Sequence, residues 1–199
     1  ILRQVLPKFA LAYPNIEVRI SEAMPEEAKE LLLKREADFL ISGDGSFNRN
    51  DDFTFEIIKA IPVLIYVRKD HPILEKELNL ISLLGYPLVT ASYFSPEHPF
   101  IKKISTKFKT DIKVSPKIVC SDYMALKEIV LNSDSWMVSP NLSMFMDKEL
   151  DDGQLVSMSF GDLVLKTDIS TIELADRSRS PAAKKFLKMC HEYFDDLEL

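Results

Sequence analysis

The chain has 199 residues, of which 46% are apolar and 28% are charged, so it can bury a core in one or two small domains. It contains no apolar run long enough to span a bilayer and no secretory signal pattern. Its net charge of -6 argues against nucleic-acid binding by this piece alone, because phosphate contacts need clustered Lys and Arg. Since the first residue is not Met, we expect a piece of a longer, cytoplasmic protein.

The first part of the chain predicts a helix, a strand, a second helix and a second strand. Apolar residues recur at helical spacing over 2–13, where Pro7 is expected to mark the start of the regular helix or a bend. Alternating apolar residues over 16–20 predict a strand with one buried face. A helix over 25–37 then leads to the short apolar run 38–41. A strand–helix–strand unit of this length predicts a right-handed parallel crossover.

The middle of the chain begins with a polar loop and continues as alternating strands and helices. The stretch 53–67 has β-type composition, is interrupted by Pro62, and ends in a turn over 68–72. Either Ser121 or Asp122 can cap one of the helices. The further predicted elements are a helical turn over 80–84, strands over 86–90, 117–120 and 136–139, and helices over 100–108, 122–132 and 140–153.

The last part predicts strands over 155–160 and 167–174 and a final helix that Ser180 caps. Alternating strands and helices indicate an α/β protein with parallel sheets. The extended runs 60–68 and 164–175 are the natural places for the chain to cross between two lobes. We therefore expect lobe I over 1–67 plus 170–199, and lobe II over 68–169.

The sequence offers no obvious catalytic, metal or cofactor set. Its three histidines lack metal-ligand spacing, no Gly-x-Ser-x-Gly elbow occurs, and the five glycines form no phosphate loop. We therefore expect no catalytic residues, no metal and no cofactor. Cys120 and Cys190 lie in apolar surroundings, so two buried free thiols are favoured over a redox pair.

A binding role agrees better with the pattern. In open α/β sheets, ligands bind beyond the carboxyl ends of the strands, where helix N-termini present free N–H groups. Plain helix capping is the alternative role for each serine in these positions. The candidate residues at such positions are Met24, Ser92, Ser121 and Asn141.

Several short motifs occur in a fixed order along the chain. They are Leu6-Pro-x-Phe with Tyr13-Pro, Asp38-Phe-Leu-Ile, His71-Pro72, Ile81-Ser-Leu-Leu with Tyr86-Pro-Leu-Val-Thr90, Met137-Val-Ser-Pro140, and Ser180-Pro-Ala-Ala with Phe186. With them, the chain resembles the effector-binding domain of a LysR-type transcriptional regulator over essentially its whole length. The resemblance implies two hinged Rossmann-like lobes, the type 2 periplasmic binding protein fold. It also implies dimer or tetramer assembly, no membrane contact, and DNA binding only through an N-terminal winged helix-turn-helix that this chain lacks.

The resemblance further implies a small organic effector between the lobes, and we expect one that carries a carboxylate. The chain departs from the family pattern at 23–25, where small polar residues are usual, and at 133–136, where a Gly-x-Gly stretch is usual. We expect hydroxyl donors and a floor residue from lobe II and apolar contact from lobe I. The predicted ligand-binding residues are Met24, Pro25, Thr90, Ser92, Ser121 and Asn141.

Two other functions share this fold. A solute-binding protein of a transporter would need an export signal or lipid anchor. A cleft enzyme, such as a prephenate dehydratase, would need a catalytic acid or polar group in the cleft. A helix-turn-helix encoded upstream of Ile1 would favour the regulator over both.

Overall fold

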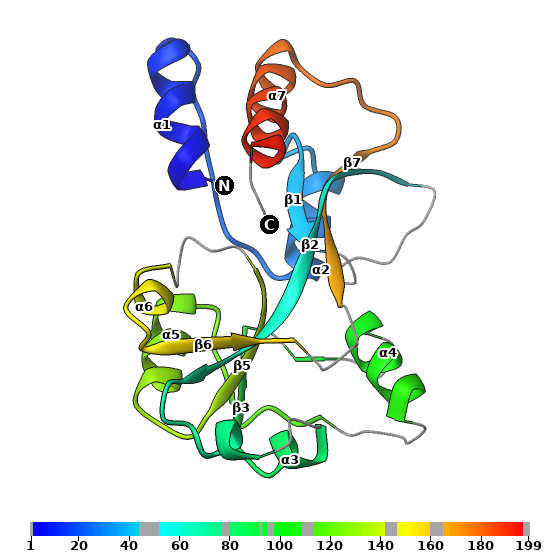
Figure 1. Ribbon diagram of the computed structural model, residues 1–199. Helices are drawn as coiled ribbons and strands as arrows, with labels where there is room; N and C mark the ends of the chain where they lie inside the picture. The colour runs from blue at the N-terminus through cyan, green and yellow to red at the C-terminus, as the bar shows by residue number, and fades with distance from the viewer. Residues whose placement is uncertain are drawn as a thin grey trace. The chain divides into compact units, whose positions relative to one another are not determined.

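The computed structural model describes residues 2–43, 52–76, 80–91, 93–94, 98–108, 114–141, 147–159 and 165–196. The chain divides into two compact units, Ile1–Ala60 with Asp168–Leu199, and Ile61–Thr167 (Figure 1). Among the described residues, no helix is both long enough and apolar enough to cross a membrane.

The first unit combines three helices with a small sheet. Strand β1 pairs antiparallel with β7, with Leu40 opposite Ile172, and β7 neighbours β2. The elements are α1 (Leu2–Ala12), α2 (Pro25–Leu33), β1 (Leu40–Gly43), the first part of β2 (Phe53–Arg68), most of β7 (Lys166–Leu174) and α7 (Pro181–Asp195).

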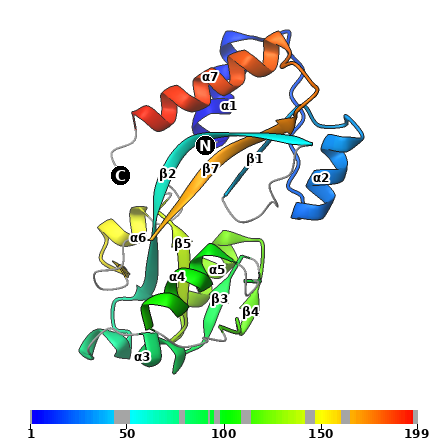
Figure 2. The ribbon, with the colours of Figure 1, turned by 90° about the vertical axis from the view of Figure 1, so that its right-hand side faces the viewer.

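Alternation along β1 explains how this unit buries both faces of its sheet. Phe39 and Ile41 pack on the cluster that α1 and α7 share, where the Phe9 and Phe186 rings lie 5.1 Å apart. Leu40 points to the other face and packs with α2 and β7. Figure 2 shows α1 and α7 together on one side of the strands of this unit.

The first strand and the crossover predicted for this unit do not form among its described residues. The predicted strand over 16–20 is not a strand, and Val18 and Ile20 are 39% and 46% exposed. Alternating apolar residues indicate a buried face, but a strand also needs a hydrogen-bonded neighbour. The neighbour of β1 is β7, in antiparallel orientation, and not the segment over 16–20. The expected parallel crossover is therefore absent from the described part of this unit. Helix α1 begins at Leu2, so Pro7 lies inside the helix and does not mark its start.

Helix α2 ends earlier than the predicted helix over 25–37. Arg35 adopts a left-handed conformation with φ 60°, and its N–H donates to the Leu32 carbonyl at 2.9 Å. The N–H of Glu36 then donates to the Leu31 carbonyl at 2.9 Å. This reversal satisfies the last carbonyls of the helix and stops it at Leu33.

The second unit has a five-stranded mixed sheet in the order β4-β3-β5-β2-β6. Strand β3 is parallel to β4 and to β5, whereas β2 is antiparallel to β5 and β6. Its elements are the second part of β2, the 3-10 turn η1 (Pro72–Glu75), α3 (Leu80–Leu84), β3 (Leu88–Thr90), α4 (Pro99–Phe108), β4 (Ile118–Val119), α5 (Tyr123–Leu131), β5 (Trp136–Pro140), α6 (Asp147–Asp151) and β6 (Leu155–Met158).

Alternation again assigns side chains to two cores. Leu88 and Trp136 point to the face that α3 and α4 cover, and the Trp136 Nε1–H donates to the Tyr86 carbonyl at 3.2 Å. Val89 and Met137 point to the opposite face, against α5. The Trp that departs from the family pattern is thus a core residue with its polar atom satisfied.

Two boundaries in this unit also differ from the prediction. Strand β2 runs through Pro62 without a break, at the point where its pairing with β5 begins at Val63. Proline is tolerated where the chain needs no ladder N–H, and its carbonyl still accepts from Asn141 N at 2.7 Å. The predicted helix over 140–153 is described only as α6, because residues 142–146 lie outside the described residues and Pro140 ends β5.

The His71-Pro72 motif forms a buried turn. The Nδ1 of His71 accepts from Ile73 N at 3.0 Å, and its Nε2 lies 3.1 Å from the Asp134 carbonyl. With one ring nitrogen accepting and the other donating, the ring is the neutral tautomer. Burial lowers the pKa of His71, since the charged form loses solvation.

One ion pair in this unit is largely buried. Lys127 on α5 donates to Glu149 on α6 at 2.6 Å, and only 6% of the lysine side chain is exposed. This hydrogen bond lowers the pKa of the Glu149 carboxyl. The pair joins two helices that are separated in the sequence by β5 and the residues that follow it.

Candidate ligand-binding site

The carboxyl ends of three neighbouring strands meet at one edge of the second-unit sheet. Because β4, β3 and β5 are parallel, the residues that follow them share this edge, which we call the strand-end edge. It carries Ser121 after β4, Thr90 at the end of β3 and Asn141 after β5. The Cys120 N–H donates to the Thr90 carbonyl at 3.0 Å, which keeps β3 and β4 together up to the edge.

Asp122, and not Ser121, caps helix α5. Its Oδ1 accepts from Met124 N at 2.8 Å and from Ala125 N at 3.3 Å. Ser121 precedes the cap and is exposed. The capping alternative for Ser121 is therefore wrong, and two of the helix-start N–H groups expected to help a ligand already serve the Asp122 carboxylate.

Asn141 is held by two contacts from β2. Its main-chain N–H donates to the Pro62 carbonyl, and its side-chain Oδ1 accepts from the Tyr66 hydroxyl at 3.4 Å. Sequence reasoning missed Tyr66, because its place in an apolar strand indicates a core residue. The core position is correct, but the hydroxyl extends to the residue that follows β5.

The other predicted site residues are placed as follows. Thr90 is 1% exposed, so it could contribute only to the floor of a ligand site. Ser92 lies outside the described residues. Met24 and Pro25 open α2 in the first unit, where Met24 is 60% exposed and makes no side-chain cap bond. Pro25 lacks an N–H, and Glu26 and Glu27 follow it, so this helix start favours no anion.

Neither cysteine shows a redox arrangement. Both are free, and they belong to different units. Cys190 is fully buried, and burial raises the pKa of its thiol to about 11, which keeps it protonated at neutral pH. Cys120 is partly buried and packs against the core next to α5. Among the described residues, no three His, Cys, Asp or Glu side chains form a group that could hold a metal.

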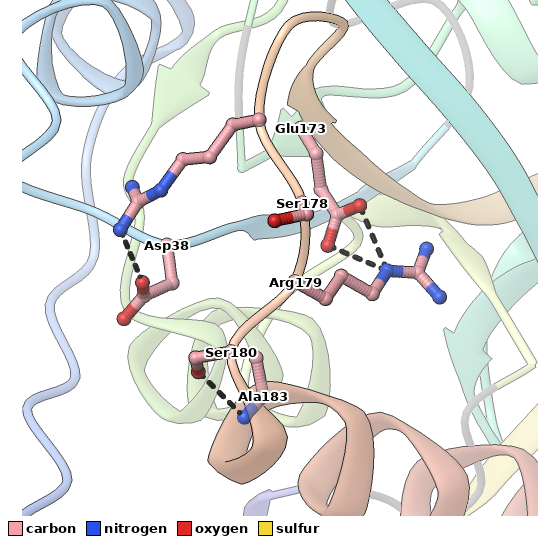
Figure 3. Close-up of a pocket in the computed structure, with 7 residues that line it drawn as sticks. Asp38, Glu173, Ser178, Arg179, Ser180 and Ala183 are labelled. Carbon is pink, nitrogen blue, oxygen red and sulfur yellow. Dashed lines mark hydrogen bonds and ion pairs between the residues drawn. The ribbon is translucent and has the colours of Figure 1, made fainter.

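The first unit has a small polar recess at the start of α7 (Figure 3). Arg177 pairs with Asp38 at 2.6 Å, and Arg179 pairs with Glu173 at 2.8 Å and also with Glu56. In Figure 3, Arg179 extends to Glu173 on one side of the loop while Asp38 lies on the other. Ser180 caps the helix by accepting from Ala183 N at 3.1 Å.

In these pairs two arginines face three carboxylates. Glu173 is buried on β7 and needs a cation, which Arg179 supplies. Both arginines that line the recess are paired with carboxylates, which holds the loop over 175–180 against the sheet and leaves neither free to bind an anionic ligand.

Two α/β units, of which the second carries polar residues at the shared ends of parallel strands, have the architecture of a ligand-binding module. The sequence matches the family described as LysR substrate binding domain over residues 1–195, and the chain belongs to that family. The family and its structures confirm the predicted fold class, the type 2 periplasmic binding protein fold.

Known relatives agree with this assignment. The chain is 36% identical over 83 residues to the uncharacterized HTH-type transcriptional regulator YbhD of Escherichia coli strain K12; the match covers 41% of this chain and 26% of that protein. The Synechocystis PCC6803 CcmR regulatory domain, solved in complex with 2-PG, has a TM-score of 0.76 at 17% identity and covers 98% of this chain and 92% of that one.

A third relative is the effector binding domain of QuiR in complex with shikimate. Its TM-score is 0.71 at 18% identity, covering 100% of this chain and 92% of that one. At these identities the two solved structures show the shared fold alone.

Proposed function

We propose that this chain senses a small organic effector for a LysR-type transcriptional regulator. The observation that carries the proposal is the strand-end edge, where three parallel strands end in residues with hydroxyl or carboxamide groups within a family of substrate-binding domains. Shikimate bound to QuiR and 2-PG bound to CcmR support small-molecule sensing by this fold. The chain itself has no catalytic role in this proposal.

The proposed ligand contacts are the Ser121 hydroxyl, the Asn141 carboxamide and Ser92, above a floor that includes Thr90. A contribution from Met24 and Pro25, and contact of the effector with both units, stay predictions. A ligand that favours one arrangement of the chain can pass a signal only through that difference in affinity. The N-terminal DNA-binding domain, cytoplasmic location, and dimer or tetramer assembly belong to the same proposal.

We revise our expectation of where a carboxylate of the effector would lie. A carboxylate placed at the start of α5 would meet Asp122, which already accepts the N–H groups of Met124 and Ala125. Two like charges at one helix start repel each other. We propose that hydroxyl or carbonyl groups of the effector face Ser121, and that any carboxylate lies elsewhere on the edge.

Separate serine and aspartate variants test this site. A thermal-shift screen would compare small organic acids with their uncharged amides and esters, and calorimetry would follow on the hits. Ser121→Ala should lower affinity about two- to twelvefold while stability changes by less than about 0.5 kcal/mol. Asp122→Ala should instead lower the free energy of unfolding by about 1 kcal/mol, because it removes the helix cap.

The control for the serine change is Ser115→Ala, which removes an exposed hydroxyl before β4, away from the strand-end edge. It should change neither affinity nor stability. Unchanged affinity in both Ser92→Ala and Ser121→Ala would contradict the proposed site.

A further inference from the structure

Tyr66 combines a buried ring with a hydroxyl at the edge of the core. The residue is 2% exposed and packs with Val89, Leu126 and Met137 beneath α5. A buried phenol needs a hydrogen-bond partner, because an unsatisfied hydroxyl would cost desolvation energy. One partner that it reaches is Asn141, at 3.4 Å from the Tyr66 hydroxyl to Oδ1.

The strand register explains how a core residue reaches the strand-end edge. Tyr66 lies opposite Met137, and Val63 lies opposite Pro140, so Asn141 follows the end of the paired stretch. The main chain of Asn141 is fixed there by its N–H bond of 2.7 Å to the Pro62 carbonyl. Strand β2 thus holds both the backbone and the side chain of one edge residue.

We infer that Tyr66 is a positioning residue for the effector site, an inference that rests on the function proposed above. Its hydroxyl donates to Oδ1 and turns the carboxamide oxygen of Asn141 toward the core. The Nδ2 group then remains to meet the effector. Because Nδ2 only donates, the matching effector atom is an acceptor, such as a carbonyl or hydroxyl oxygen. Holding the side chain in advance also removes part of the ordering cost of binding.

The first test needs no ligand. NMR scalar couplings would report the χ1 distribution of Asn141 in the wild-type chain and in Tyr66→Phe, which keeps the ring and removes the hydroxyl. A single rotamer in the wild type and averaging in Tyr66→Phe is the expected result. Tyr86→Phe is the matched control, because its hydroxyl bonds Lys76 and not the strand-end edge. Averaging in the wild type, or an unchanged Asn141 in Tyr66→Phe, would overturn the inference.

The second test uses shikimate as the probe in a double-mutant cycle. If shikimate binds, Tyr66→Phe should weaken it about two- to tenfold when Asn141 is present and cause no further loss in Asn141→Ala. If Tyr66 were merely structural, Tyr66→Phe would lower the affinity by the same factor in both backgrounds, and that result would overturn the inference. Failure of shikimate to bind counts against this ligand class for the proposed function, whereas the NMR result decides the role of Tyr66 by itself.

Discussion

Several residues of this chain are understood only through the partners that the fold brings to them. The histidine of the His-Pro motif is buried in a turn in its neutral form, and of the two residues that could cap α5, Asp122 and not Ser121 does so. Lys127 is buried beside Glu149, whose carboxylate accepts from its Nζ at 2.6 Å. Each of these arrangements makes a measurable prediction about stability.

His71 should make the protein less stable in acid. Its pKa is lowered from 6.5 by burial, so the folded chain binds the proton more weakly than the unfolded chain. Stability is therefore fully present above the unfolded pKa and falls as the pH drops below about 6.5. His71→Asn keeps an acceptor for Ile73 N and cannot titrate. Urea unfolding across this range should show a smaller pH slope in the variant, and equal slopes would contradict the assignment.

The two members of the buried ion pair should respond differently to substitution. Glu149→Ala leaves the Lys127 ammonium buried without its partner and should cost about 1–3 kcal/mol, less than for a fully buried pair because Glu149 keeps some solvent contact. Lys127→Met removes the charge and keeps the apolar stem, so it should change stability by less than about 1 kcal/mol. Chemical denaturation of both variants measures the difference. A larger loss in Lys127→Met than in Glu149→Ala would contradict this account.

At the scale of elements, the ends of helices and strands depend on single backbone conformations and on ladder partners. Helix α2 stops where Arg35 turns left-handed, and α5 starts where Asp122 accepts two N–H groups. The segment over 16–20 has the alternation of a strand but no ladder, because β1 pairs with β7. Composition predicts the kind of element, and the hydrogen-bond partner decides whether and where it forms.

Arg35→Gly should stabilise the first unit. The left-handed conformation costs a residue with a Cβ about 1–2 kcal/mol, whereas glycine adopts it readily. Part of this gain is offset by the greater freedom of glycine in the unfolded chain and by loss of the exposed Arg35–Asp176 pair. A net gain of about 0.5–1 kcal/mol in thermal or urea unfolding is expected. Arg35→Ala is the control and should not show it, and equal stability of the two variants would contradict the explanation.

At the scale of the whole molecule, the exposed apolar residues and the net charge bear on partners. Leu33 is 49% exposed on α2, whereas Leu131 on α5 is partly buried against the core. The apolar stripe of α5 therefore includes Leu131. Met124 is the exposed large apolar side chain on this helix among the described residues.

We expect self-association at micromolar concentration, as in the family that the chain belongs to. Leu33→Lys should weaken it, because a charge would replace an exposed apolar side chain in the contact. Leu11→Lys is the control, a more exposed leucine on a different helix of the same unit. Light scattering gives the mass of each variant. A monomeric mass of the wild-type chain throughout the micromolar range would contradict the prediction.

The chain should not bind duplex DNA tightly without the expected upstream domain. Its net charge is -6, and phosphate recognition requires clustered cations whose binding weakens steeply with salt. A gel-shift titration at two salt concentrations is the measurement. A tight, salt-sensitive shift by these 199 residues would show that the proposed division of labour between domains is wrong.

The α/β class, most helices, the family and the location of Ser121 and Asn141 at strand ends could all be predicted from the sequence. They depend on periodicity, helix-start residues and motif order, which are local properties. Ser121 and Asn141 are proposed as site residues in this way, because both follow predicted strands that end at one sheet edge.

The remaining features depend on contacts between distant residues. The antiparallel pairing of β1 with β7 joins segments more than a hundred residues apart, and no local pattern contains that choice. The same holds for the Tyr66 hydroxyl on Asn141, 75 residues away, and for Lys127 beside Glu149. Burial and hydrogen bonding are pairwise in space, so the partner of a polar group is decided when the chain packs.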